Sequence, residues 1–192
     1  MKAYKLTDQN GQTINKTQWG EGIEHTATGI DNNLCSDGWI HFYTSPLLAV
    51  LLNPIHANFK NPKLWECETS GEEIHEPLKS GCKTLKTLRE IPLPTITTTQ
   101  KVAFAILCAK KVCKSKDWNV WADNWLSNKD RSKDAASSAY ASSAYVSAAY
   151  AAYASAASSA YASAAYASAA ANAANAASNI NFIQIAEEAM KY

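Results

Sequence analysis

The chain of 192 residues lacks the sequence features of export and of membrane insertion. Its start, MKAYKLTDQNG, contains no apolar signal core, and no run approaches the ~20 apolar residues that a membrane helix needs. The five cysteines are scattered and include no C-x-x-C pair, which favours reduced and mostly buried thiols over a disulfide framework. We therefore expect a cytoplasmic protein with no membrane partner.

Excess charge and catalytic motifs are missing as well. The formal net charge is +1 and the pI about 7.6, so the chain has no general electrostatic attraction to nucleic acid. It contains no Gly-rich phosphate loop, no G-x-S-x-G and no H-E-x-x-H. No His stands at metal-ligand spacing, and His25, His56 and His75 show no partner spacing. We expect no metal, no cofactor and no nucleic-acid partner, and the missing motifs favour a protein that is not an enzyme.

What the chain does contain is a tract, residues 135–178, built almost entirely of Ala, Ser and Tyr, without charge, Gly or Pro. The high helix propensity of Ala predicts helices here. Tyr residues recur mostly five apart, and five residues turn a helix by about 140°, so one long exposed helix would show aromatic rings on all sides. We expect several Ala-rich helices that pack together or associate with copies of themselves. The alternative is a pentapeptide-type β-solenoid.

Strand and turn patterns dominate the part before the tract. Residues 2–6 and the aromatic, β-branched residues 39–43 predict strands. Residues 64–68 alternate apolar and charged side chains, as a half-buried strand does, and Ser70-Gly71 predicts a turn after them. Residues 82–91 predict a strand pair or an extended segment.

Two helix starts carry capping signals. Ser45 as N-cap and Pro46 at the first helical position open an apolar helix, which Asn53-Pro54 should end. Thr97 and Gln100 have the spacing of a capping box and open a helix to about residue 114.

Two amphipathic helices complete the prediction. Trp118, Trp121 and Trp125 recur at helical spacing, and the tail from Ile180 onward carries an apolar face that includes Ile183. The expected fold class is α+β: a mixed domain over 1–134, the Ala/Ser/Tyr tract over 135–179, and an amphipathic capping helix over 180–192.

The most chemically suggestive stretch runs from residue 37 to 45. His41 stands there between aromatic residues on a strand, and the strand ends in hydroxyl residues at a helix start. A helix N-terminus can hold an anion, and aromatic rings can stack on a base or a nicotinamide. The alternative interpretation is that His41 is an ordinary hydrogen-bonded strand residue and Ser45 only a cap.

This stretch, together with the opening strand Ala3-Tyr4-Lys5-Leu6, Trp19 and the apolar helix after Ser45, resembles a family of small bacterial domains with the ADP-ribosyltransferase-like fold. The resemblance implies NAD contacts from His41, from the hydroxyl residues Thr44 and Ser45, and from the first strand. It also implies a Glu on a later strand; Glu66 and Glu68 lie on such a strand, but their surroundings match no active-site motif. Our candidate ligand-binding residues are Tyr4, Lys5, His41, Tyr43, Thr44 and Ser45, with no catalytic residue assigned.

A second resemblance covers more of the chain. The run from Lys83 to Arg131, followed by an Ala-rich array and an Ile-rich end, is similar to proteins of phages and prophages that differ mainly in the array. The two resemblances together imply a phage-encoded, homo-oligomeric protein in the host cytoplasm. It would sequester a nucleotide-type ligand made by host immunity, and the tract would drive assembly. The alternatives are an NAD-dependent ADP-ribosyltransferase and a structural phage component.

Overall fold

The computed structural model describes residues 2–141, 159–176 and 179–192. In these ranges the chain is α+β, with one five-stranded antiparallel sheet and six α-helices. It divides into two compact units, Met1–Pro94 and Thr95–Tyr192. The sequence grouping of 1–134 differs from this division, because the helices after Pro94 pack with the Ala-rich helices. None of the described helices is long and apolar enough to span a membrane.

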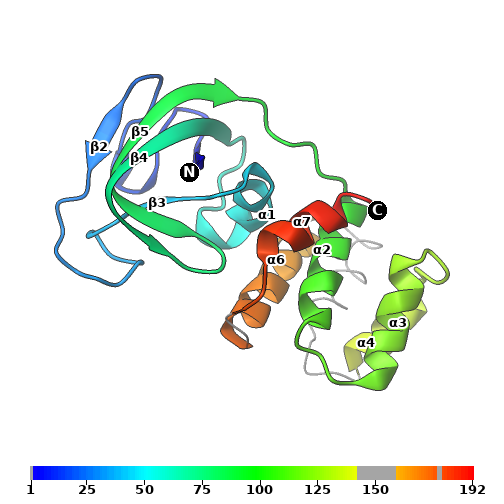
Figure 1. Ribbon diagram of the computed structural model, residues 1–192. Coiled ribbons are helices and arrows are strands. Elements are labelled where there is room, and N and C mark those ends of the chain that lie inside the picture. The colour runs from blue at the N-terminus through cyan, green and yellow to red at the C-terminus, as the bar shows by residue number, and fades with distance from the viewer. Residues whose placement is uncertain (1, 142–158, 177–178) are drawn as a thin grey trace. The chain divides into compact units, whose positions relative to one another are not determined.

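The sheet of the Met1–Pro94 unit is strongly curved (Figure 1). Its hydrogen-bonded order is β1-β4-β5-β2. Strand β3 also pairs with β5, next to the segment of β5 that pairs with β2. Tyr4 and Tyr43 exchange two backbone hydrogen bonds of 2.8 Å, which join the end of β3 to β1. Strands β1, β4, β5 and β3 therefore follow a closed path. The strands are β1 (Ala3–Thr7), β2 (Glu24–Thr26), β3 (Ile40–Phe42), β4 (Lys63–His75) and β5 (Ser80–Ile91).

The longest strands correct one prediction and agree with another. The expected turn at Ser70-Gly71 is wrong, since β4 continues through both residues to His75, whereas β5 is the extended segment, one of the two alternatives predicted for residues 82–91. Gly71 has a φ of +80°, and the register with β5 shifts between Ser70 and Glu73. A glycine with positive φ lets a strand absorb a bulge without ending. The chain turns instead at Glu76–Lys79, where the Glu76 N–H donates to the Lys79 carbonyl at 3.0 Å.

The inside of the curved sheet is an apolar cluster that includes Trp65, Phe42 and Leu85. On the other face of β1 lies α1 (Pro46–His56), whose buried side chains include Leu48, Leu51 and Leu52. A one-turn 3-10 helix, η1 (Ile14–Lys16), precedes Trp19.

Helix α1 confirms the predicted start and corrects the predicted end. Ser45 caps it and Pro46 opens it, but the helix passes Asn53-Pro54 and ends at His56. Pro54 lacks the N–H that would bond to the preceding turn, and this loss falls near the end of the helix. Asn53 also supports the end, because its side chain exchanges hydrogen bonds of 2.9 and 3.0 Å with the backbone of Phe59.

The Thr95–Tyr192 unit is helical and centred on α2 (Thr98–Lys110), whose residues from Val102 to Ala109 are all buried. The capping box of Thr97 and Gln100 is confirmed. Helix α3 (Lys116–Leu126) buries Trp118, Trp121 and Trp125, as the spacing predicted. Helices α3, α6 and α7 all contact α2.

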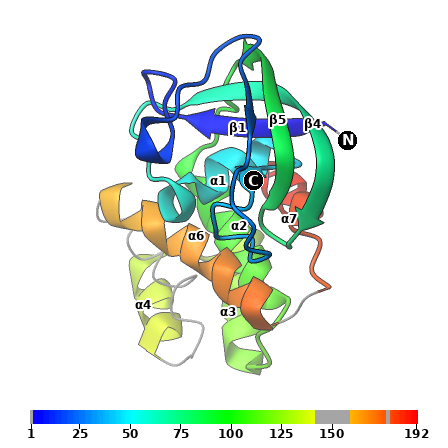
Figure 2. The same cartoon turned by 90° about the vertical axis from the view of Figure 1, so that its left-hand side faces the viewer.

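Within the tract, the described residues form α4 (Lys133–Ala141) and α6 (Ser159–Ala176), and these ranges contain no solenoid coil. Figure 2 shows α6 lying across α2, which it contacts; Ala169, Ala170 and Ala173 are among its buried residues. Residues 142–158 and 177–178, and the tyrosine side chains of the tract, lie outside what is described. The tail forms α7 (Phe182–Ala189), which buries Ile185, whereas the predicted Ile183 is half-buried.

Candidate functional site

Folding brings four of the six predicted ligand-binding residues together. Tyr4 on β1 lies opposite Tyr43 at the end of β3, and the two backbones are hydrogen-bonded. The Lys5 ammonium group donates to the His41 carbonyl across the same strands, at 2.9 Å. The first strand and the 37–45 stretch, far apart in sequence, are therefore neighbours in the sheet.

Lys5 points into the core rather than toward a ligand. It is 7% exposed, and its ammonium nitrogen lies 4.5 Å from the centre of the Trp19 ring. Burial lowers its pKa from 10.5 to about 8, against the opposing effect of the nearby thiols of Cys67 and Cys82. In the described fold Lys5 therefore has a structural role, because its hydrogen bond to His41 connects β1 to β3.

The start of α1 uses its own hydroxyl. Ser45 is 5% exposed, and its Oγ accepts from the Leu48 N–H at 3.5 Å. The cap takes up one of the backbone donors that an anion would need at this helix start. Thr44, between β3 and α1, is half-buried. Among the hydroxyl residues, Ser45 thus has the simpler role of a cap.

Tyr43, which follows β3, contacts His56, a residue to which sequence reasoning assigned no role. The Tyr43 hydroxyl lies 2.9 Å from His56 Nδ1, and the two rings are stacked. Burial raises the pKa of Tyr43, so the phenol keeps its proton, and the tautomer of His56 decides which of the two atoms is the donor. Burial, with smaller contributions from the positive charges of Lys79 and His41, lowers the pKa of His56 to about 4.

His41 also lies within range of the Lys79 charge. Its Nε2–H donates to the Leu34 carbonyl, which leaves Nδ1 to take up a second proton. Burial lowers the pKa of His41 most; the Leu34 bond opposes this effect, Lys79 and Lys5 add to it, and Glu76 opposes it. His41, His56 and Lys79, together with the Tyr43 hydroxyl, form what we call the cationic cluster. All three side chains belong to partly exposed residues, and the two imidazoles become cationic when they take up a proton.

Sequence reasoning missed His56 and Lys79. His56 ends α1 and Lys79 lies in the β4–β5 turn, so only the tertiary fold brings them within electrostatic range of His41. No local spacing signals this arrangement. Lys79 also donates to the exposed Cys35 Sγ at 2.9 Å.

The two glutamates implied by the transferase resemblance lie on β4, as expected. Glu66 is directly opposite Tyr4 in the register of β1 and β4. Its carboxylate is held by Arg89, with nitrogen to oxygen distances of 2.7 and 2.8 Å. Glu68 is exposed and lies opposite Lys86.

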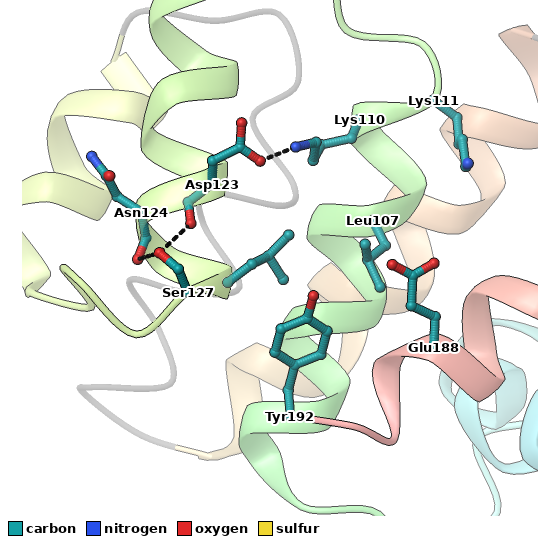
Figure 3. Close-up of a pocket in the computed structure, with 9 residues that line it drawn as sticks. Leu107, Lys110, Lys111, Asp123, Asn124, Ser127, Glu188 and Tyr192 are labelled. Atoms are coloured by element: carbon teal, nitrogen blue, oxygen red, sulfur yellow. Dashed lines mark hydrogen bonds and ion pairs between the residues drawn. The ribbon is translucent and has the colours of Figure 1, made fainter.

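A second candidate site is a hollow of about 660 Å³ in the helical unit (Figure 3). Lys110 and Asp123 form an ion pair across it, between α2 and α3, and the Tyr192 ring lies on another side. Because these two opposite charges are paired with each other, the hollow shows no clear preference for a charged ligand. Its lining is Leu107, Lys110, Lys111, Asp123, Asn124, Leu126, Ser127, Glu188 and Tyr192.

No three His, Cys, Asp or Glu side chains in the described part of the chain lie together in a way that would hold a metal ion. Comparisons of the chain with protein-family models, with curated proteins and with solved structures found no match.

Proposed function

We propose that the Met1–Pro94 unit binds a small nucleotide-type anion at the cationic cluster and thereby sequesters it. One observation carries the proposal: the positive charge of Lys79 lies close enough to both His41 and His56 to lower the pKa of each imidazole. Burial and a neighbouring positive charge both disfavour the protonated form of an imidazole. A bound anion stabilises this protonated form, so such groups favour anion binding. Tyr4, which is half-buried and adjacent to Tyr43 in the sheet, would supply aromatic surface near this anion.

In biological terms, we propose that a phage-encoded protein binds and withdraws a nucleotide signal of host immunity. The resemblance to phage proteins supports this role. The tract varies in length among those proteins, which suits an assembly element rather than a ligand site. Assembly through residues 135–178 remains part of the proposal.

Calorimetry of the full chain with NAD, ADP-ribose and cyclic nucleotides tests the binding. The phosphodiester charges of these probes do not titrate between pH 5 and 7, so a pH dependence reports on the protein. The histidine pKa values are depressed without ligand and rise when an anion binds, so binding takes up protons. Affinity should therefore increase as pH falls, by about tenfold or more from pH 7 to pH 5.

Variants locate the site. His56→Gln and Lys79→Gln should each weaken binding at least fivefold. His25→Gln, in β2, and Lys16→Gln, in η1, remove the same groups from the same unit and should leave binding unchanged. A panel with no heat of binding, or a site variant that binds as tightly as its control, would overturn the proposal.

The same samples distinguish the transferase alternative, which the position of Glu66 opposite Tyr4 favours. Release of nicotinamide from NAD, lost in Glu66→Gln and kept in Glu68→Gln, would identify an enzyme instead of a sequestering protein. Stable NAD with measurable binding supports sequestration.

A further inference from the structure

A hydrogen-bonded chain of side chains lies at the end of the β4–β5 hairpin and takes no part in the proposed function. Ser80 Oγ lies 2.9 Å from His75 Nδ1, and His75 Nε2 lies 3.1 Å from Glu73 Oε2. The sheet register explains the arrangement, since His75 and Ser80 are directly opposite and Glu73 precedes His75 by two residues on the same face. A hydroxyl, an imidazole and a carboxylate in this order form the unit that activates serine in hydrolases.

The carboxylate determines which imidazole nitrogen carries the proton. Glu73 Oε2 accepts from Nε2–H, so Nδ1 of neutral His75 has a free lone pair for the Ser80 hydroxyl. Thr69 Oγ1 donates to the other carboxylate oxygen of Glu73 at 2.5 Å, which holds the carboxylate in place. The imidazole is therefore oriented as a general base toward Ser80.

We propose that Ser80, His75 and Glu73 form a nucleophilic site that takes a small acyl group from a carboxylic ester. Ser80 Oγ forms a bond to the acyl carbon, and its proton passes to His75 Nδ1. The bond from the acyl carbon to the leaving alcohol breaks, and the alcohol oxygen takes that proton. Water then attacks the acyl carbon and gives one proton to His75, which returns it to Ser80 as the carboxylic acid leaves. Glu73 stabilises the imidazolium in both steps.

The surroundings set the size of the acyl group. Ser80 is 3% exposed and lies opposite the fully buried Phe42 in the register of β3 and β5. The Phe42 ring meets His75 edge-on, with ring centres 6.1 Å apart. The His75 side chain, at 45% exposure, is more open to solvent than the Glu73 side chain, at 27%. An acyl group must pass the His75 imidazole to reach the buried Ser80 hydroxyl. We therefore expect the site to accept only a small, uncharged acyl group.

A fluorophosphonate probe with small, uncharged substituents tests the proposal on the full chain. Activated Ser80 Oγ displaces fluoride from phosphorus and gives its proton to His75, which leaves a stable adduct that peptide mass spectrometry locates. We expect the adduct on Ser80. Labelling should vanish in Ser80→Ala, fall about 100-fold or more in His75→Gln, and fall about tenfold or more in Glu73→Gln. Ser70→Ala and His25→Gln, in the same unit, should label at the wild-type rate.

The wild-type result is decisive by itself, so a variant that fails to fold leaves the test intact. No adduct on Ser80 at millimolar probe overturns the proposal, and so does an adduct that persists in His75→Gln. Circular dichroism checks the fold of each variant. The result is also independent of the proposed function: Ser80→Ala should bind nucleotides as the wild type does, and the absence of nucleotide binding has no effect on the labelling result.

Discussion

At the scale of single residues, Lys5 combines a positive charge with a position inside the curved sheet. Its pKa is about 8 in the folded protein, against 10.5 as the ordinary value. Below pH 8 the amine is protonated in both the folded and the unfolded chain, and the full cost of burying the charge is present. Between about pH 8 and 10.5 the unfolded chain binds more protons, so the free energy of unfolding rises with pH. The difference between the two pKa values corresponds to a change of about 3 kcal/mol in the free energy of unfolding.

Replacing Lys5 by Met should remove this pH dependence. At pH 7 we expect Lys5→Met to be at least as stable as the wild type, because it loses a buried charge along with the bond to His41. As pH rises from 7 to 10.5, the free energy of unfolding of the wild type should increase by about 3 kcal/mol relative to that of Lys5→Met. Urea unfolding at several pH values measures it, with the exposed Lys60→Met as control. Parallel stability curves for the wild type and Lys5→Met would contradict the buried charge.

At the scale of elements, the capping box of α2 is the clearest case of a local signal with a measurable contribution. Thr97 accepts from the Gln100 N–H at 3.2 Å, and Gln100 Oε1 accepts from the Thr97 N–H at 2.9 Å. Gln100 Nε2 also donates to the Met190 carbonyl at 3.0 Å, which connects the start of α2 to the end of α7.

Thr97→Ala should therefore lower the free energy of unfolding of the helical unit by about 1 kcal/mol. Thr97→Ser keeps the hydroxyl and should recover most of the loss. Thr98→Ala, one residue into the helix, is the matched control and should be neutral or slightly stabilising. Urea unfolding followed by helical circular dichroism gives the comparison. Equal stability of Thr97→Ala and Thr98→Ala would show that the cap contributes nothing.

The elements that sequence reasoning predicted are those whose signals lie within one or two turns. Ser45 with Pro46, Thr97 with Gln100, and the tryptophans of α3 all specify their structures locally. The continuation of β4 through Gly71 depends on its pairing with β5, and no local pattern distinguishes a bulge there from a turn.

The candidate site shows the same division. Tyr4, Lys5, His41 and Tyr43 were grouped by resemblance, and the fold makes them neighbours. His56, His75 and Lys79 gain their partners only from the arrangement of α1 and the β4–β5 hairpin around β3. The importance of His56 and Lys79 depends on contacts between segments distant in sequence, whereas the partners of His75 lie within one hairpin whose register the local pattern does not specify.

At the scale of the whole molecule, the five thiols report on the two units separately. Cys35 is exposed, Cys67 and Cys82 are buried in the Met1–Pro94 unit, and Cys108 and Cys113 are buried in the Thr95–Tyr192 unit. Burial raises the pKa of Cys67 and of Cys82 to about 12, and raises that of Cys108. Because the thiolate is the reactive form, burial protects Cys67, Cys82 and Cys108 both sterically and by keeping them protonated.

A short pulse of a thiol reagent at increasing urea should therefore label only Cys35 in the native protein. Cys67 and Cys82 should become reactive together at one urea midpoint, and Cys108 and Cys113 together at another, because each unit has its own core. Peptide mass spectrometry reads each site. In Cys35→Ser, the native protein should take up no label during the pulse. One shared midpoint for all four buried thiols would mean that the two units unfold as a single cooperative structure.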